Sequence, residues 1–437
     1  MKQLDMTTGK IQSLILSLAI PIIGSSLLQF TYNFMDMLWV GGLGSYAVAS
    51  VGSASFYLNL GYALQACIVV GSGVKIAHAI GSKDDVQSKA YIQTGMFLNF
   101  VLGIIFIMIF TLFGQQLLQY LGIQESNVIQ QGYFYLLGSL PMIVCSFFNT
   151  FFIRVLQNYG IMKQAFYISC IGMILNMVLD PILIYIFKFG VLGSAIGSSV
   201  GHIIMFLMFL DKFKDYFLFS IKGVTKDKLK QVLQLGIPMT FQRVLFTLVN
   251  IILAKLIAQF GAEAIAAQKI GLQIESIMFM VIGGCNGAIA SFTGQNFGAK
   301  LYERVDRGYR YTLKISIVYA CIALLLFLWI PNVLASIFVR DDVTILIASN
   351  YLRIVSISQL FSAIEMISNG YFTGIGKPKI PAVISIVFTV LRIPFAMICT
   401  PLLGINGIWL SISISSICKG IFAYCMYHHI KKKELIV

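Results

Sequence analysis

Charged side chains are scarce in this sequence of 437 residues, since Asp, Glu, Lys and Arg together make up 11% of it. Soluble globular domains usually carry about 25% charged residues. Cysteine is also sparse: the eight cysteines all lie in apolar stretches and form no CxxC pair, which indicates small core residues and not a disulfide framework or a metal site. These absences argue against a soluble protein and against a disulfide-stabilised one.

Signatures of catalysis and nucleotide hydrolysis are missing too. There is no HExxH, no GxSxG and no Walker sequence. The stretch "FTGQNFGAK" at 292–300 has the composition of a phosphate loop but lacks the GxxxxGK[ST] spacing. "GIGKPK" fails the same test, because Tyr371 stands where the first glycine is needed. We therefore predict that the protein is not an enzyme and has no resident cofactor.

Hydrophobic residues are abundant, at 58% of the chain. Apolar stretches of about 20 residues or more recur from end to end, and each can cross a bilayer core of ~30 Å as a helix. The predicted fold class is an all-α polytopic membrane protein with twelve transmembrane helices. The predicted spans are 12–38, 47–74, 91–113, 132–153, 165–187, 190–210, 231–257, 264–292, 311–331, 346–373, 380–402 and 404–427.

The basic residues are distributed unevenly between alternate loops. The side that holds both termini collects 22 lysines and arginines, from Lys2 to the Lys431–Lys433 run, whereas the opposite side collects two, Lys188 and Arg340. By the positive-inside rule both termini are cytoplasmic, which requires an even number of spans. The net charge of +14 therefore reflects membrane topology and not nucleic-acid binding. We expect a multi-pass protein of the plasma membrane, which in a bacterium is the inner membrane.

The chain repeats itself once. The separation from Pro21 to Gly44 equals that from Pro238 to Gly261, and "LAIPIIG" aligns with "LGIPMTF" at the start of the two copies. Two copies of six helices in the same orientation form a parallel repeat, with the substrate at the interface between the halves. The repeat predicts two pseudo-symmetric lobes, 1–210 and 231–437, joined by a basic cytoplasmic linker at 211–230.

Asp36 interrupts the apolar run "FTYNFMDMLWVGGLG" at 30–44. Helical spacing aligns it with Asn33, Gln29 and Ser25 in one polar stripe. Two further spans carry similar stripes. They are Asn176 with Asp180, and Ser194 with Ser198 and His202.

The depth of these side chains in the membrane brings them to one level. Asp36 lies eight residues before Gly44, Asp180 eight before Lys188, and Ser198 eight after Gly190. A rise of 1.5 Å per residue places all three about 12 Å below the outer surface, with Asn176 one turn deeper. Oxygen-bearing side chains from three helices can therefore meet around a common cavity.

An acid near the middle of a membrane helix costs about 2.5–3.5 kcal/mol on insertion scales, so both aspartates need an explanation. A structural ion pair is one, although the spans of the first lobe contain no Lys or Arg to complete it. A helix-packing hydrogen bond could account for one acid but not for two. The third explanation is a site that alternates between carboxylic acid and carboxylate, or between empty and Na⁺-bound. His202 is better explained as a packing residue than as a proton relay.

The second half is built differently, because no acid occupies the position equivalent to Asp36. Its spans contain Glu275 and Glu365, together with the basic residues Arg243, Lys269, Arg353 and Arg392. For both glutamates a local ion pair is favoured over direct contact with a substrate.

The sequence resembles the multidrug and toxic compound extrusion (MATE) transporters over nearly its whole length. The resemblance rests on "LAIPIIGSSLLQFTYNFMDMLWVGGLGSYAVASVG", "LNMVLDPILIY", "GVLGSAIGSS", "FGAEAIAAQKI", "GQNFGAK" and "RIP". It implies two six-helix lobes and export of cationic or amphipathic drugs and organic compounds in exchange for H⁺ or Na⁺. The acidic pair most resembles the DinF-like branch.

Site residues follow from the same resemblance. The family's first-lobe cation site, for H⁺ or Na⁺, falls on Asp36, Asn176, Asp180 and Ser198, where Ser198 replaces the usual Thr. We predict that the substrate cavity involves Gln29, Asn33, Gln268, Glu275 and Glu365. Gln268 stands where many relatives have an aromatic residue or His, which weakens any inference about inherited substrate preference.

Three other functions are possible for such a sequence. A lipid-linked oligosaccharide flippase of the same superfamily is the nearest alternative, but it should have a cationic cavity where this first lobe is acidic. A membrane-embedded enzyme lacks its catalytic clusters here, and a passive channel does not explain paired acids in a two-lobe repeat. The expected partners are small organic molecules and the lipid bilayer, with the protein as a monomer and without nucleic acid.

Overall fold

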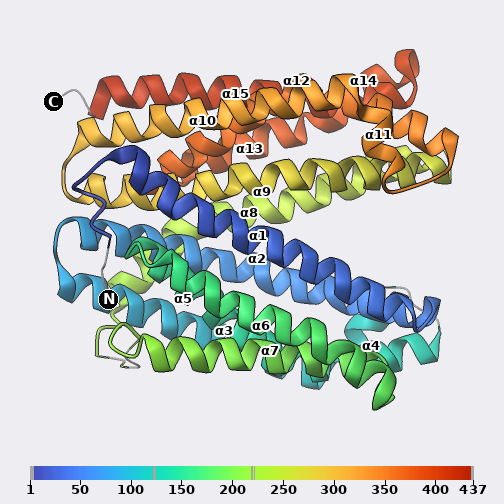
Figure 1. The fold of residues 1–437 in the computed structure, drawn as a ribbon, viewed down its shortest axis with the longest axis horizontal. Helices are drawn as coiled ribbons and strands as arrows, with labels where there is room; N and C mark the ends of the chain where they lie inside the picture. Colours follow the sequence, from blue (N-terminus) through green and yellow to red (C-terminus); the bar gives the residue numbers. More distant parts are fainter. Residues whose placement is uncertain (1–3, 122–124, 218–219, 221, 435–437) are drawn as a thin grey trace. The chain divides into compact units, whose positions relative to one another are not determined.

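The computed structural model describes residues 4–121, 125–217, 220 and 222–434, and all regular structure in this part of the chain is helical (Figure 1). Of the charges counted above, Lys2 and the side chain of Lys433 lie outside the described residues. The helices are α1 (Ile11–Gly41), α2 (Ser45–Gly81), α3 (Asp85–Tyr120), α4 (Ser126–Gly138), α5 (Leu140–Asn158), α6 (Met162–Pro181), the π-helical turn η1 (Ile182–Ile186), α7 (Val191–Lys212), α8 (Lys226–Ala258), α9 (Ala262–Gly298), α10 (Tyr302–Trp329), α11 (Pro331–Ser336), α12 (Asp342–Gly374), α13 (Lys379–Val390), α14 (Arg392–Leu403) and α15 (Ile405–Glu434).

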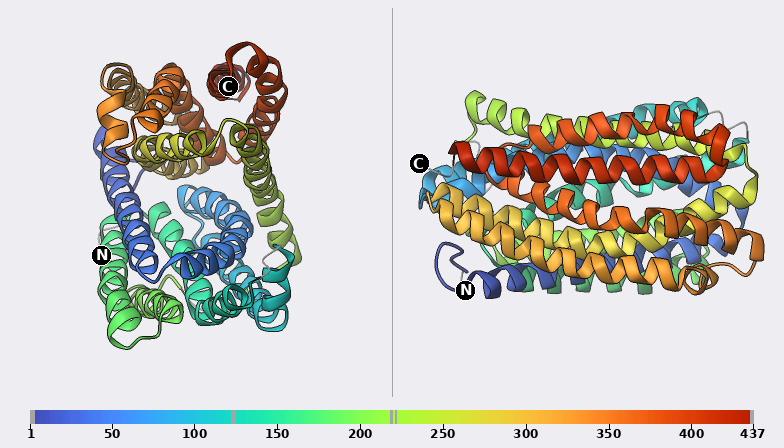
Figure 2. Two further views of the ribbon diagram at one scale, coloured as in Figure 1. Left: turned by 90° about the vertical axis from the view of Figure 1, so that its right-hand side faces the viewer. Right: turned by 90° about the horizontal axis from the view of Figure 1, so that it is seen from above.

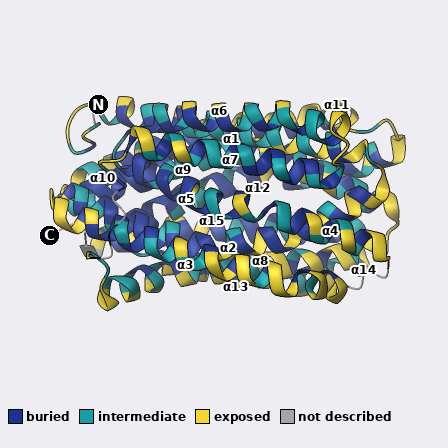
Figure 3. Cartoon of the chain, turned by 90° about the horizontal axis from the view of Figure 1, so that it is seen from below, coloured by how far each residue is buried: buried dark blue, intermediate teal, exposed yellow. Residues whose placement is uncertain are grey.

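Twelve stretches of helix in the described chain are long and apolar enough to cross a membrane. This confirms the predicted fold class and the predicted number of spans. Figure 3 shows buried and exposed residues mixed along these helices, the pattern of elements with one packed face and one outward face. The outward faces carry large apolar side chains such as Met37, Leu112 and Leu402, which suits contact with lipid.

Three spans are interrupted where the sequence predicted continuous helices. The predicted span 132–153 is divided at Ser139, directly before the proline-containing first turn of α5. α13 ends and α14 begins on either side of Leu391. After Pro181 the chain continues as the π-helical turn η1, and Phe187 N donates to Ile182 O at 3.0 Å. Proline has no N–H to donate, so the regular i to i−4 pattern cannot continue through it.

The chain divides into two compact units, and neither is continuous in sequence. The first comprises Met1–Asp5 and Gly24–Gly236, and the second comprises Met6–Ile23 and Ile237–Val437. The lobes predicted from chain order assign residues 6–23 to the first half, whereas here they pack with the second. α1 and α8 therefore each begin in one unit and continue in the other. Pro21 lies near the changeover in α1.

The internal repeat is visible in the backbone. α2 and α9 each contain 37 residues, and the glycines before them share an unusual conformation, with φ 100° at Gly44 and 101° at Gly261. With ψ near 180°, this region is accessible essentially only to glycine. The backbone conformations of Lys83 and Lys300, which follow the two helices, also match, with φ of 58° and 60°. The corresponding turns thus have the same geometry.

Each unit is a bundle of long helices, which the left view of Figure 2 shows end-on. In the first unit, Phe106, Phe110, Phe147 and Leu136 are among the residues of a buried apolar cluster. In the second, Tyr351, Trp409 and Leu253 belong to an equivalent cluster. Within each unit α2 and α9 are among the most buried spans, with 61% of the apolar window buried in each. The repeated helix therefore occupies an interior position in both bundles.

Candidate cation site

The first unit contains a polar cluster formed by α1, α6 and α7. Asp36 of α1 accepts a hydrogen bond from Ser194 Oγ of α7 at 2.8 Å. The hydroxyl of Ser194 is fully buried, with 0% exposure, so the carboxyl group of Asp36 is tied to α7 inside the unit. Helical rise predicts that Asp36 and Ser198 of α7 lie at the same depth, and the bond from Ser194 shows that Asp36 and α7 meet.

The other three residues of the predicted cation site, Asn176, Asp180 and Ser198, are joined by hydrogen bonds. Asn176 Nδ2 of α6 donates to Asp180 Oδ1 at 3.1 Å, one helical turn along, and to Ser198 Oγ of α7 at 3.1 Å. None of the three is more than 2% exposed. The side chain of Asn176 thus uses its amide hydrogens to join the two helices.

The two carboxyl groups form the centre of the cluster. Asp36 and Asp180 lie within hydrogen-bonding reach of each other. Two ionised carboxylates cannot bond, because a carboxylate has only acceptor atoms. A proton held by either one would supply the missing donor.

Two neighbouring acceptor atoms lack a donor altogether. They are Asn176 Oδ1 and Asp180 Oδ2, both buried from solvent. Buried polar atoms in proteins almost always have a partner, and an unmet one costs about 1–3 kcal/mol. This donor deficit fits a group that brings either a hydrogen to donate or a positive charge.

Glycines of α7 create the space for these side chains. A Cβ atom at Gly197 would lie 2.2 Å from Asp180 Oδ1 and 3.5 Å from Asn176 Nδ2. One turn along, a Cβ at Gly201 would lie 2.7 Å from the backbone oxygen of Gly172 in α6. The close approach of α6 and α7 follows the small-residue packing common between membrane helices. Any side chain at position 197 would displace the carboxyl group.

Tyr32 is a member of the cluster that sequence reasoning missed. Its hydroxyl lies 3.0 Å from Ser198 Oγ. Four residues before Asp36, it lies on the same face of α1, and this spacing was the available signal. Together with Gln29, Met173 and Met205 it lines a small cavity of about 10 Å³, room for about one water molecule.

The polar stripe of α1 continues away from the cluster. Gln29 Nε2 donates to Asn33 Oδ1 at 3.1 Å, and Asn33 is exposed. These two predicted cavity residues therefore bond to each other and not to the carboxyl pair. His202 lies nearby on α7, and Asn149 of α5 donates to its backbone oxygen at 2.9 Å, in keeping with a packing role.

Glu275 in the second unit does not form the expected ion pair. It accepts hydrogen bonds from the hydroxyl of Tyr351 and the amide of Gln359, both on α12, and is buried. Among the described residues no basic group lies within ion-pair distance of it, and Arg392 attracts it only at longer range. The prediction failed because Tyr351 and Gln359, one helix away, are neutral donors that meet a buried carboxyl group at a lower desolvation cost.

Arg392 and Lys419 form a separate basic cluster in the second unit. Arg392 is buried, and its guanidinium donates to Ser415 Oγ at 3.0 Å and Ser416 Oγ at 3.3 Å. Lys419, which was not among the predicted site residues, is 4% exposed. Both cations lie over the ring of Phe246, and both are attracted by Glu365. Glu365 thus has basic neighbours but, among the described residues, no ion pair within 4 Å. Gln268 is half-buried on α9.

The stretch Gly294–Asn296, which lacks the spacing of a phosphate loop, binds the N-terminal segment. Gln295 Oε1 accepts from Met6 N at 3.2 Å, and Asn296 Nδ2 donates to Met6 O at 3.0 Å. Arg304 donates to the backbone oxygens of Met6, Thr8 and Gly9 at 2.9–3.1 Å. We call these contacts the N-terminal clip. The motif thus has a structural role within the second unit.

Over the described residues, no group of three or more His, Cys, Asp and Glu is placed to hold a metal ion.

Comparison with known proteins agrees with this architecture. The chain is 27% identical to a probable multidrug resistance protein, YoeA, of Bacillus subtilis, over 95% of this chain and 93% of the relative. It is 24% identical to the multidrug export protein MepA of Staphylococcus aureus, over 92% and 90% of the two chains.

The fold has solved counterparts. A crystal structure of MATE in a straight conformation superposes with a TM-score of 0.91 at 24% identity, covering 100% of this chain and 99% of the other. The model of the MatE protein family matches twice, at residues 21–182 and 238–398, which confirms the repeat beginning at Pro21 and Pro238. The chain belongs to the MatE family, the MATE transporters that the sequence resembled, whose members are transporters and not enzymes.

Proposed function

We propose that the protein is a secondary active antiporter that exports cationic or amphipathic organic compounds in exchange for H⁺ or Na⁺. Membership of the MatE family supports transport, and the names of the relatives YoeA and MepA support drugs as substrates. The acidic character of the cluster in the first unit favours organic cations over the anionic lipid-linked sugars of a flippase.

One observation carries the proposal: the pair of half-buried Asp36 and buried Asp180, with a deficit of donors beside it. A proton shared between the two carboxyl groups would convert two repelling acceptors into a hydrogen-bonded pair. A sodium ion would use the same oxygens, with Asp36, Asp180, Asn176 and Ser198 as its ligands. The residues fit either ion, since hard cations prefer oxygen ligands.

Cation binding would alter how α1 is held in the first unit. Asp36 is bonded to Ser194 of α7, so a change in its charge changes the attraction between α1 and α7. α1 passes from the second unit to the first just after Pro21, and a proline within a helix is a natural site of bending. An inward membrane potential would help to drive the ion, at about 2.3 kcal/mol per charge per 100 mV.

The substrate cavity is proposed to involve Gln29, Asn33, Gln268, Glu275 and Glu365. The amide groups of Gln29 and Asn33 offer neutral donors and acceptors. Glu275 is held by two neutral donors and forms no ion pair among the described residues, whereas Glu365 is attracted to Arg392 and Lys419. We therefore rank Glu275 above Glu365 as a substrate contact.

The protein is proposed to lie in a plasma membrane as a monomer, with both termini in the cytoplasm. Basic residues favour cytoplasmic termini in a plasma membrane, and both relatives named above come from bacteria. The acidic pair on α1 and α6 favours the DinF-like branch. A monomer suffices, because each proposed site residue is supplied by this chain.

Transport driven by separate ion gradients tests the proposal. The purified protein is reconstituted in vesicles, and movement of the cationic dye ethidium is followed under a proton gradient or a sodium gradient imposed alone. One of the two gradients should drive the dye uphill. The assay is repeated with several other organic cations in place of ethidium. An antiporter would be excluded if every compound only equilibrates, or does not move at all, under either gradient.

A further inference from the structure

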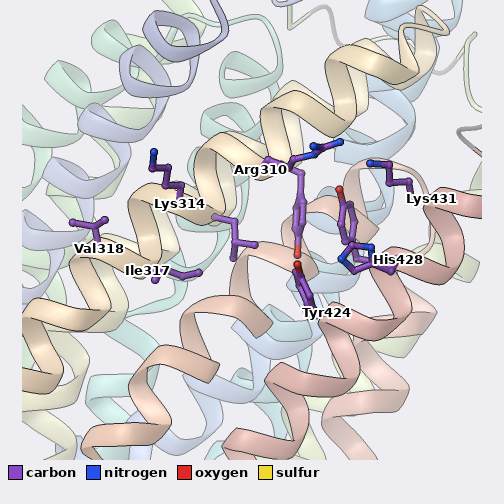
Figure 4. Close-up of a pocket in the computed structure, with 10 residues that line it drawn as sticks. Arg310, Lys314, Ile317, Val318, Tyr424, His428 and Lys431 are labelled. Atoms are coloured by element: carbon purple, nitrogen blue, oxygen red, sulfur yellow. The ribbon is translucent and has the colours of Figure 1, made fainter.

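A cleft outside the proposed transport pathway lies between α10 and α15 in the second unit. Its volume is about 430 Å³, within the usual range of small-molecule sites. Both helices pack against α12, and Figure 4 shows the residues of the two helices that line the cleft. The cleft is lined near the end of α15 by Arg310, Lys314, Tyr424, His428 and Lys431.

An ionic network centred on Asp306 holds two of the basic residues that line the cleft. Asp306 accepts from Arg310, from the hydroxyl of Tyr427 and from Lys431, whose Nζ lies 3.0 Å from Oδ1. The rings of Tyr309 and Tyr427 stack at 3.9 Å between centroids. These bonds join α10 to α15 and hold the basic groups in place.

The charges of the cleft do not balance. Its lining residues include three basic groups, Arg310, Lys314 and Lys431, and no acidic one. Arg310 and Lys431 share the carboxylate of Asp306, and Lys314 has no ion pair within the described chain. The side chain of Arg310 remains 64% exposed despite its bond to Asp306, so several of its donors stay free for another acceptor. The excess positive charge favours an anion.

The rest of the cleft is apolar and open toward the membrane. On α10, Lys314 precedes Val318 and Ile322 at helical spacing, and both are more than half exposed. No charged residue follows Lys314 before the end of α10 at Trp329. On α15, exposed Ile421 and Tyr424 precede His428 and Lys431 on the matching face. Each helix therefore presents apolar groups along the span and basic groups at its end.

We propose that this cleft binds an anionic phospholipid from the leaflet on the side of the termini. The phosphate group lies among Arg310, Lys314 and Lys431, and an acyl chain follows the apolar side chains of α10 and α15. Charge and exposure both favour a lipid over a soluble phosphate ester. A lipid has a phosphate group for the basic end of the cleft and acyl chains for its apolar part, whereas a soluble ester has only the phosphate group. Naming that leaflet as cytoplasmic rests on the proposed orientation, but the binding itself does not depend on transport.

Photolabelling in nanodiscs tests the site. The protein is embedded in phosphatidylcholine that contains either phosphatidylglycerol with a photoreactive acyl chain or phosphatidylcholine with the same chain. Mass spectrometry should find several-fold more label from phosphatidylglycerol on the peptides of Val318 and Tyr424. Lys314→Glu should reduce that labelling several-fold, and Lys314→Arg should keep it.

A matched control is Lys379→Glu, an exposed lysine at the start of α13 that does not line the cleft. It should leave labelling at the wild-type level. Equal labelling by the two lipids, or a Lys314→Glu variant that folds normally and labels like the wild type, would overturn the proposal. Loss of label on addition of excess glycerol 3-phosphate would assign the site to a soluble phosphate ester. None of these readouts depends on whether the protein is an antiporter.

Discussion

At the scale of single residues, the cluster in the first unit is defined by a shortage of donors. Asn176 donates its amide hydrogens to Asp180 and Ser198. Neither Asn176 Oδ1 nor Asp180 Oδ2 has a hydrogen-bond donor. A purely structural polar network would be expected to satisfy these atoms internally. Because these unmet acceptors lie beside the paired carboxyl groups of Asp36 and Asp180, they support the proposed cation site.

Gly197→Ala is predicted to disturb the site without touching a polar group. Its Cβ would lie 2.2 Å from Asp180 Oδ1, so the carboxyl group or α7 must move, and overpacking of this kind costs about 1–3 kcal/mol. Gradient-driven export should fall at least several-fold, and thermal unfolding should begin at a lower temperature.

Gly52→Ala provides the control for this change, because a Cβ there meets nothing within 4 Å. It should transport and unfold as the wild type does. If Gly197→Ala matched Gly52→Ala in both assays, the close fit of α7 around Asp180 would have no functional weight.

How much of the site could be predicted depended on the kind of contact. Asp36, Asn176, Asp180 and Ser198 could be grouped from depth alone, because helical rise converts sequence distance into height in the membrane. Depth says nothing of rotation about the helix axis. That is why the sequence did not reveal that Ser194 bonds Asp36, or that neutral donors on α12 would surround Glu275.

At the scale of elements, α1 is unusual because its two parts belong to different units. Residues 6–23 are held to the second unit, in part by the N-terminal clip, while the part that carries Asp36 belongs to the first. Chain order alone assigned all of α1 to the first lobe, since contacts between distant segments leave no periodic signal. The breaks at Ser139 and Leu391 were missed because an apolar stretch sets the length of a span and not its continuity, whereas Pro141 and Pro394 beside them were the available signals.

Asn296→Ala is predicted to loosen the N-terminal clip. The substitution removes the donor to Met6 O and the acceptor of Arg304 Nε, and loss of such buried hydrogen bonds costs about 1–3 kcal/mol. The backbone amide of Met6 should then exchange its hydrogen faster, as measured by deuterium uptake of the N-terminal peptide. Asn332→Ala on α11, an exposed position, should leave that exchange unchanged. Equal uptake in the two variants would show that the clip contributes nothing to holding this segment.

At the scale of the whole molecule, the duplication organises both sequence and structure. Family matches beginning at Pro21 and Pro238 coincide with equal helix lengths and equal turn conformations in the two halves. The chemistry of the halves has diverged, because the acid of α1 has no counterpart in α8. A single cation site in the first unit is the simplest arrangement that this asymmetry supports.

The orientation of the chain yields a prediction of its own. With 22 basic residues on the side of the termini and two on the other, both ends should face the cytoplasm. In bacteria that express the full chain, green fluorescent protein fused to the C-terminus should fluoresce, and alkaline phosphatase at the same position should be inactive. Active phosphatase would reverse the assigned topology and move the lipid cleft to the outer leaflet.

The central claim, that the Asp36–Asp180 pair couples ion flow to export, is tested most directly by Asp36→Asn in vesicles. The amide keeps the shape and can still bond Ser194, but it cannot change its charge. The account predicts that the variant still exchanges ethidium across the membrane without a gradient but no longer accumulates it when the ion gradient is imposed. Asp211→Asn, which neutralises an exposed acid at the end of α7, should accumulate the dye like the wild type. Undiminished uphill accumulation by a normally folded Asp36→Asn protein would contradict the account.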